Sequence, residues 1–257
     1  MTVMPIGAPA ALSLHQVSVS FPIYHGTSRS LKKSLMYRTS GGRIAQDANH
    51  RVVVKALHEI SVKLGERDRL GLVGNNGAGK TTLLRVMAGV YEPTSGLVKA
   101  SGRISSIFDI GIGIDPELNG YENIRLRGLL LQLPRAEIEE KLQEIADFTE
   151  LGDYLDMPVR TYSSGMMMRL TFAVATCFVP EIVLMDEWIL AADMHFMSKA
   201  QKRIEEFITK SSIFVLATHN LDLMSQWCTK GLWLQNGRAK ALGPIKEIVD
   251  AYRLEAQ

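Results

Sequence analysis

The chain has 257 residues, of which 46% are hydrophobic and 22% charged, so it is long and apolar enough to bury a large core. Its 29 basic and 27 acidic residues leave a formal net charge of +2, which argues against the strong positive field of a nucleic-acid-binding protein. Two cysteines, Cys177 and Cys228, lie far apart in apolar surroundings, and we expect buried thiols in a reducing compartment, without a disulfide framework.

The first hundred residues predict mainly strands. Residues 11–21, ALSLHQVSVSF, alternate apolar and polar side chains as a half-buried strand does. Residues 56–74 predict two more strands on either side of a turn at Gly65 and Glu66.

The segment between these strands, residues 24–51, carries six Arg or Lys side chains against the single acid Asp47. We expect an irregular insertion around a short helix. Leu31 and Leu35 could share one face of that helix with Lys32, Lys33 and Arg38 on the other, as in a helix lying on anionic lipid. A solvated surface helix is the alternative.

Residues 116–155 have a helical pattern. Leucines recur at helix spacing (Leu126, Leu129, Leu130 and Leu133), and Pro134 precedes a second predicted helix. Strands return at 181–187, at 211–220 and at 231–243, the last as a hairpin turned at Asn236-Gly237. The predicted fold is therefore α/β, with a mixed core of residues 1–107 and 181–257 and an inserted helical subdomain of residues 108–180.

The sequence predicts neither a membrane span nor a secretory signal. The longest apolar stretch, residues 170–185, is interrupted by Pro180 and Glu181, and a span needs ~18 to 20 uninterrupted apolar residues. The first residues, MTVMPIGAPAA, lack a basic region followed by an apolar one.

The segment GNNGAGKTT fits the phosphate-binding pattern G-x-x-x-x-G-K-[ST]. An apolar RLGLV before it and TTLLRVMAGV after it predict a strand and a helix, so backbone N–H groups and a helix N-terminus would face one anion. Lys80 would contact the β- and γ-phosphates and Thr81 would bind Mg²⁺. A glycine-rich turn with a solvated lysine is the alternative. The predicted loop residues are Gly74, Asn75, Asn76, Gly77, Ala78, Gly79, Lys80, Thr81 and Thr82.

Three further polar residues follow predicted strands. Asp186 and Glu187 end the run IVLMDE, where ligands of α/β sheets collect; Asp186 could hold Mg²⁺, and Glu187 could orient or deprotonate an attacking water. His219 follows another apolar run and could hydrogen-bond a γ-phosphate or that water. Alone, the two acids could be solvent-facing strand ends, and the histidine a structural hydrogen-bonding group.

The order of these motifs, with YSSGM between the helical segment and IVLMDE, resembles the nucleotide-binding subunit of ATP-binding cassette (ABC) transporters. The resemblance implies a P-loop NTPase (RecA-like) core with an antiparallel β subdomain. YEPTSG, PELNGYENIRLRG, RTYSSGM and MDEW are most similar to the ATPases that export bacterial surface polysaccharides such as O-antigen, capsule or teichoic acid. The resemblance further implies that the chain hydrolyses ATP with Mg²⁺, forms a homodimer and binds an integral membrane partner. It also implies that the chain is peripheral to the cytoplasmic face of the bacterial inner membrane and does not bind nucleic acid.

The stretch RTYSSGMMMRLTF, residues 160–172, fits a helix cap before a helix that runs to Pro180. The resemblance identifies YSSGM with the family signature L-S-G-G-Q. It implies that Ser163, Ser164 and Gly165 contact the γ-phosphate of ATP bound to the other subunit of a head-to-tail dimer. Ser164 replaces the usual glycine and Met166 the usual glutamine.

Other implied positions are less regular. The resemblance assigns Asp193 to the D-loop, while residues 107–114, where a glutamine is usual, contain Asp109 and no glutamine. An aromatic residue should stack on adenine, Phe21 or alternatively Tyr24. One rival function is a soluble ABC ATPase of translation or repair. The other is a serine hydrolase that uses Ser163 or Ser164, but the sequence around these serines lacks the G-x-S-x-G motif of a nucleophile elbow.

Overall fold

The computed structural model describes residues 2–3, 9–22, 44–46, 52–107, 113–131, 133–187 and 194–255. The chain separates into a core unit (Met1–Ile104, Glu181–Glu187 and Ser212–Gln257) and a helical unit (Ser105–Pro180 and Trp188–Ser211). Residues 188–211, which the sequence pattern assigned to the core, group with the helical unit.

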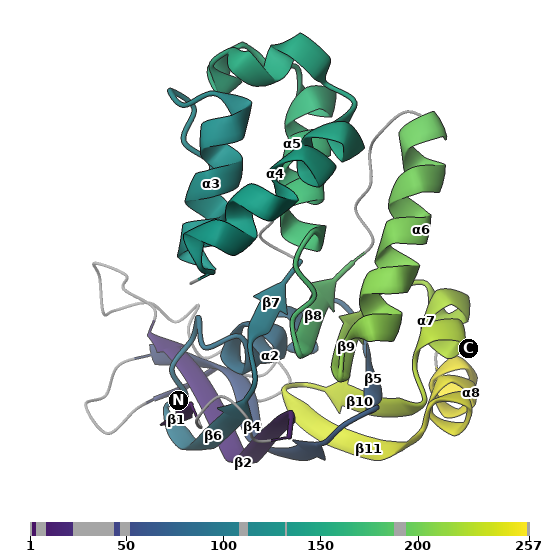
Figure 1. Cartoon of the computed structure of the whole chain (residues 1–257). Helices are drawn as coiled ribbons and strands as arrows, with labels where there is room; N and C mark the ends of the chain where they lie inside the picture. The colour runs from purple at the N-terminus through teal and green to yellow at the C-terminus, as the bar shows by residue number, and fades with distance from the viewer. Residues whose placement is uncertain are drawn as a thin grey trace. The chain divides into compact units, whose positions relative to one another are not determined.

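A six-stranded mixed sheet runs through the core unit (Figure 1). In spatial order its strands are β11 (Arg238–Pro244), β10 (Lys230–Gln235), β5 (Arg69–Val73), β9 (Ile213–Ala217), β8 (Ile182–Asp186) and β7 (Ile104–Ser106). β8, β9, β5 and β10 pair in parallel, so their carboxyl ends lie at one edge of the sheet. Every residue of β9 is buried, as the continuous apolar run IFVLA predicts.

The predicted hairpin is confirmed. β10 and β11 pair antiparallel, and Asn236 (φ 51°) and Gly237 (φ 76°) form the turn between them. Positive φ at both central residues is the backbone that an Asn-Gly turn favours, because it matches the right-handed twist of the two strands.

The core unit also contains a second, mostly antiparallel sheet, whose described strands have the order β1-β6-β2-β4-β3. These are β1 (Thr2–Val3), β6 (Ser95–Ser101), β2 (Ala11–Pro22), β4 (Val52–Leu64) and β3 (Ile44–Gln46). β2 and β4 confirm two predicted strands. β3 shows that part of the predicted irregular insertion is a strand paired with β4. The remaining insertion residues, 24–43 and 47–51, lie outside the described residues.

Within the described residues the core unit has the helices α2 (Lys80–Met87), α7 (Leu221–Trp227) and α8 (Ile245–Glu255). Figure 1 shows α8 beside the β10–β11 hairpin, where its residues contact both strands, and α7 next to α8. Cys228, directly after α7, is buried and unpaired, as is Cys177 of the helical unit. Burial raises the pKa of each thiol to about 12, so both are inert apolar side chains at neutral pH.

The helical unit contains α3 (Gly120–Leu130), α4 (Arg135–Thr149), α5 (Ser164–Thr176) and α6 (Met194–Lys210), with short 3-10 turns at Gly152–Asp156 and Val159–Thr161. Phe148, Phe172 and Phe196 pack together with ring centroids 5.7 to 5.9 Å apart. The predicted helix after Ser163 ends at Thr176 and not at Pro180. A helix continued through Pro180 would bring the proline ring against the carbonyl of Thr176, four residues earlier.

Two of the leucines that mark the helical pattern do not enter the core. Leu129 and Leu130 at the end of α3 are exposed, while Asn123, Ile124 and Gly128 are buried. Of the described helices, none combines the length and the apolar character that crossing a membrane would require.

Candidate functional site

The segment 74–79 forms a tight loop between β5 and α2, as its sequence predicts. Gly74, Gly77 and Gly79 adopt φ values of 151°, 75° and 111°, which side chains with a Cβ rarely reach. A Cβ on Gly79 would lie 2.9 Å from the carbonyl oxygen of Ala56. No side chain caps α2, so the N–H groups of its first turn remain available to an anion.

Lys80, only 8% exposed, turns back over this loop. Its Nζ donates to the carbonyl oxygens of Gly74 at 2.6 Å and Asn75 at 3.2 Å. Burial lowers the pKa of Lys80, and the charges of Asp186 and Glu187 partly offset this effect. The loop therefore concentrates a cation and open N–H groups in one small region, which suits a phosphate.

Asp186, the last residue of β8, accepts a hydrogen bond from the Thr81 side chain. Burial raises the pKa of Asp186, while the Thr81 hydrogen bond and the charge of Lys80 act in the opposite direction. A hydroxyl and a carboxylate held together are hard oxygen donors of the kind that Mg²⁺ prefers, with phosphates and water as its other ligands. The side chains at this position therefore fit a magnesium ion.

Glu187 and His219 meet at the same sheet edge. The Nε2 atom of His219 lies 3.3 Å from Oε1 of Glu187, and both side chains are about half exposed. Glu187 has a φ of 53°, in the left-handed region, and its N–H donates to the carbonyl of Ala217 at 2.7 Å. A non-glycine residue in this conformation costs free energy and is most often found at functional sites.

An aromatic pair occupies the end of β2. Phe21, 37% exposed, packs edge-on against Tyr91 with ring centroids 5.2 Å apart. Nη1 of Arg85 donates to the Tyr91 hydroxyl at 2.9 Å. Sequence reasoning selected Phe21 and overlooked Tyr91, although an aromatic residue soon after the phosphate-loop helix was a visible signal. Tyr24 lies outside the described residues.

Tyr252 of α8 also reaches the phosphate loop. Its hydroxyl lies 2.6 Å from Oδ1 of Asn75 and donates to it, and its ring packs edge-on against Trp233 at 5.6 Å. A cavity of about 100 Å³ lies between the loop, the hairpin and α8. The sequence contained no signal for this contact, because the two residues stand 177 positions apart.

In the helical unit, Ser163 caps α5. Its Oγ accepts a hydrogen bond from the Met166 N–H at 3.3 Å, which confirms the predicted helix cap. Ser164 takes an ordinary helical position, so a serine fits where the family has glycine. A Cβ on Gly165 would meet only Ser163 Oγ, at 3.9 Å, among the described residues.

The residue before this cap is held from two sides. The hydroxyl of Tyr162 donates to the carbonyl of Tyr154 at 2.7 Å. A Cβ on Gly120 would lie 2.8 Å from that hydroxyl, so glycine makes room for it. The segment before Ser163 is a 3-10 turn, Val159–Thr161, and not the strand from which a hydrolase nucleophile elbow rises, which disfavours the serine hydrolase.

Two implied positions, Asp109 and Asp193, lie outside the described residues. Their roles stay predictions.

A phosphate loop follows one parallel strand, two acids lie at the end of a second and a histidine follows a third, an arrangement that fits the nucleotide site of a P-loop ATPase. The family described as "ABC transporter" matches residues 57–190, slightly more than half of the chain. The chain belongs to this family and is its ATP-binding domain.

Named relatives agree. The chain is 47% identical over 227 residues to "O-antigen export system ATP-binding protein RfbE" of Yersinia enterocolitica, covering 88% of this chain and 95% of the relative. It is 39% identical to "Teichoic acids export ATP-binding protein TagH" of Bacillus anthracis, over 77% of this chain and 36% of that protein. A solved structure described as the dimeric, post-hydrolysis ATP-binding cassette MJ0796 bound to ADP and Pi matches the fold, with a TM-score of 0.65, 17% identity and coverage of 91% and 98%.

Proposed function

We propose that this chain is the ATP-hydrolysing subunit of an exporter that moves a lipid-linked surface polysaccharide across the bacterial inner membrane. The observation that carries the proposal is the high identity to an O-antigen export ATP-binding protein over nearly its whole length. Similarity to a teichoic acid export protein supports the same class of cargo. An ABC ATPase for another exported substrate is the alternative.

At the site, the chain's residues bind and orient ATP. N–H groups of the loop and of α2 contact the β- and γ-phosphates, and Lys80 moves from the loop carbonyls onto them. Phe21 packs on adenine, with Tyr91 supporting its ring. Thr81 and Asp186 would hold Mg²⁺, which supplies positive charge against the phosphate oxygens when bound.

Glu187 takes the proton from the attacking water, and the water oxygen bonds to the γ-phosphorus as the bond to the β-γ bridging oxygen breaks, giving ADP and phosphate. His219 orients Glu187 and the γ-phosphate through its position beside the carboxylate. The left-handed backbone at Glu187 aims the carboxylate beyond the strand end.

Two copies of the chain form a head-to-tail dimer in which each ATP lies between the phosphate loop of one copy and Ser163, Ser164 and Gly165 of the other. A solved cassette of similar fold that is described as dimeric supports the formation of a dimer. ATP binding favours the closed dimer and hydrolysis reopens it, so the difference in affinity between the two states drives the transporter.

The helical unit docks an integral membrane subunit, and the chain is peripheral to the cytoplasmic face of the membrane. The substrate-contacting surface would then belong to that subunit or its lipid-linked cargo. Nucleic acid is not part of the assembly.

The test is copurification of the tagged chain with the membrane protein that it binds, followed by ATPase assays in lipid nanodiscs. Lipid-linked polysaccharide extracted from the same cells should stimulate ATP hydrolysis, and Lys80→Ala should abolish both basal and stimulated rates. Stimulation by another exported molecule alone would favour the alternative cargo. Copurification with ribosomes or DNA, and no membrane protein, would overturn the proposal in favour of a soluble ABC ATPase.

A further inference from the structure

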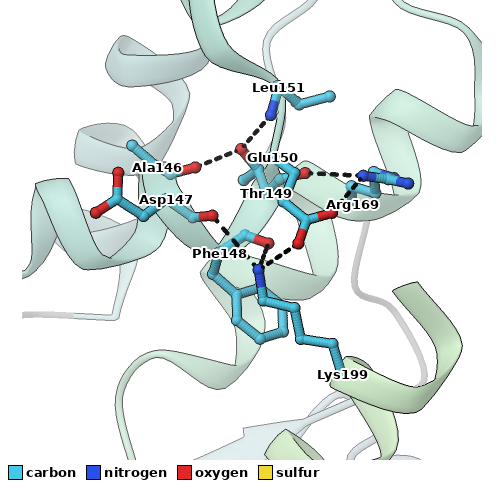
Figure 2. A network of polar contacts seen from close by, with 8 residues as sticks. All are labelled: Ala146, Asp147, Phe148, Thr149, Glu150, Leu151, Arg169 and Lys199. Carbon is cyan, nitrogen blue, oxygen red and sulfur yellow. Dashed lines mark hydrogen bonds and ion pairs between the residues drawn. The ribbon is translucent and has the colours of Figure 1, made fainter. Parts of the chain in front are cut away.

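Glu150, directly after α4, connects three helices of the helical unit (Figure 2). Its Oε2 lies 3.2 Å from Nη1 of Arg169 on α5, and its Oε1 lies 2.8 Å from Nζ of Lys199 on α6. One carboxylate thus accepts hydrogen bonds from cations on two different helices.

The backbone of Glu150 is unusual. Its φ of 56° lies in the left-handed region, which is uncommon for a residue with a long side chain. Thr149 stabilises the turn from behind, since its hydroxyl donates to the carbonyl of Ala146 at 2.7 Å and accepts from the N–H of Leu151 at 3.2 Å. Thr149 is fully buried, so the turn that presents the carboxylate is tied into the core of this unit.

The two cations are held over aromatic rings. The guanidinium of Arg169 lies 4.9 Å from the centroid of Phe196, and Nζ of Lys199 lies 4.8 Å from that of Phe148. Nζ of Lys199 also donates to the carbonyl of Phe148 at 3.1 Å. Because Arg169 is 19% exposed and Glu150 and Lys199 about one third, these contacts are less screened than fully exposed surface ion pairs.

The helices α5 and α6 are connected in the sequence to different residues of the proposed site. Arg169 stands six residues after Ser163 on the same helix, whereas α6 follows Glu187 after residues 188–193 in the sequence. We propose that Glu150 is a positioning residue that holds α5 against α6 and thereby orients Ser163 toward the ATP of the partner subunit. This inference rests on the head-to-tail dimer of the proposed function.

Two substitutions distinguish the role of the Glu150 carboxylate from a general effect of removing a nearby ion pair. Glu150→Gly removes the carboxylate, and glycine suits the left-handed backbone, so the turn itself is not strained. Glu144→Ala is the matched control, because Glu144 accepts from Lys141 of α4 at 2.6 Å and Arg203 of α6 at 2.9 Å but not from α5. In the complex with the membrane partner, Glu150→Gly should slow ATP turnover about tenfold. Glu144→Ala should change it less than about twofold.

A mixed dimer reveals the route of the effect. One copy carries Lys80→Ala, so the only working phosphate loop belongs to the other copy and depends on the signature of the Lys80→Ala copy. Differently tagged copies are purified in succession, and ATP hydrolysis and occlusion of radiolabelled ATP are both measured. Glu150→Gly should reduce both about tenfold when placed on the Lys80→Ala copy, and leave them unchanged on the other copy.

A folding defect would reduce activity equally from either copy, and equal reductions would contradict the proposed role of Glu150. An effect seen only from the copy with the working loop, or no effect from either copy, would contradict it as well. Ser163→Ala, tested in the same two placements, separates this from a failure of the proposed function. If Ser163→Ala depends on placement while Glu150→Gly does not, the dimer stands and the inference falls. If Ser163→Ala is insensitive to placement, the head-to-tail dimer and the inference both fall.

Discussion

The nucleotide-binding edge of the core unit and the start of α5 in the helical unit are built by different means. At the edge, glycines with positive φ and the ends of parallel strands place the reactive groups, so the backbone determines the geometry. At the start of α5, a single capping serine depends on a helix that ion pairs and aromatic rings hold in place. We therefore expect that a change of backbone at the sheet edge of the core unit abolishes activity. At α5, removing one charge should reduce activity only in part.

The largest effect should come from Glu187, the carboxylate proposed to accept the proton of the attacking water. Glu187→Gln keeps the size of the side chain and its place beside His219 but cannot take a proton, so ATP turnover should fall about 10³-fold. Because ATP still binds, the variant should accumulate as an ATP-dependent dimer. Phosphate release and size-exclusion chromatography with ATP measure the two quantities. A variant that stays monomeric with ATP where related cassettes dimerise would contradict the closed-dimer mechanism.

The dependence of the edge on backbone geometry can be broken with one methyl group. A Cβ on Gly74 would lie 2.3 Å from the carbonyl oxygen of Leu234, and the φ of 151° disfavours alanine. Gly74→Ala should lower the free energy of unfolding by about 1–3 kcal/mol and weaken ATP binding at least tenfold. Gly65→Ala, where a Cβ meets nothing within 4 Å, is the control and should stay within about 0.5 kcal/mol. Urea denaturation and nucleotide titration measure both, and equal effects of the two changes would contradict the explanation.

A smaller effect is expected where a side chain, and not the backbone, supports the edge. Tyr252→Phe removes the hydroxyl that donates to Asn75, and a single hydrogen bond of about 0.5–1.5 kcal/mol should raise the KM for ATP about two- to tenfold without changing kcat. Asp222→Asn is the matched control, because it weakens an exposed ion pair between Asp222 of α7 and Arg253, which lies next to Tyr252 on α8. If both variants change KM equally, α8 acts through general stability and not through Asn75.

The smallest effects are of stability, and they should have opposite signs in the two units. Burial raises the pKa of Asp186, so its contribution to the free energy of unfolding is fully present below the ordinary carboxyl pKa of about 4 and is lost as pH rises through the folded-state pKa. Asp186→Asn, although inactive, should therefore melt about 2 °C higher than the wild type at neutral pH and lose this gain in acid.

Glu144 in the helical unit should behave in the reverse way. A hydrogen bond from Lys141, aided by Arg203, lowers its pKa against the effect of burial. Its contribution is present above the ordinary carboxyl pKa and is lost as pH falls through the folded-state pKa. Glu144→Gln should lower the melting temperature slightly at neutral pH and have no effect in acid. Thermal denaturation of both variants over a pH series checks the signs, and a common sign would refute the contrast.

Much of the core followed from the sequence because its signals are local. Short patterns of a few residues each predict a backbone conformation. They are the alternation in residues 11–21, the apolar runs before Asp186 and Thr218, and the Asn236-Gly237 turn. The phosphate loop is local in the same sense, since its glycines mark the positions that need positive φ.

The helical unit was less predictable from the same kind of signal. Leucine spacing predicted helices but did not show that Leu129 and Leu130 face outward. Nor did it indicate that residues 188–211 belong with this unit. Which face of a helix is buried depends on what packs against it, and the sequence of one helix does not contain that information.

By itself, the sequence determined the longer strands β2, β4, β5, β8, β9, β10 and β11, the phosphate loop, the acids at the end of β8 and the cap of α5, because each depends on neighbouring residues. Only the tertiary structure brought Tyr252 to Asn75, Tyr91 to Phe21, and Arg169 and Lys199 to Glu150. These partners come from separate elements, and their meeting depends on how the helices and strands pack, which no local pattern of residues encodes.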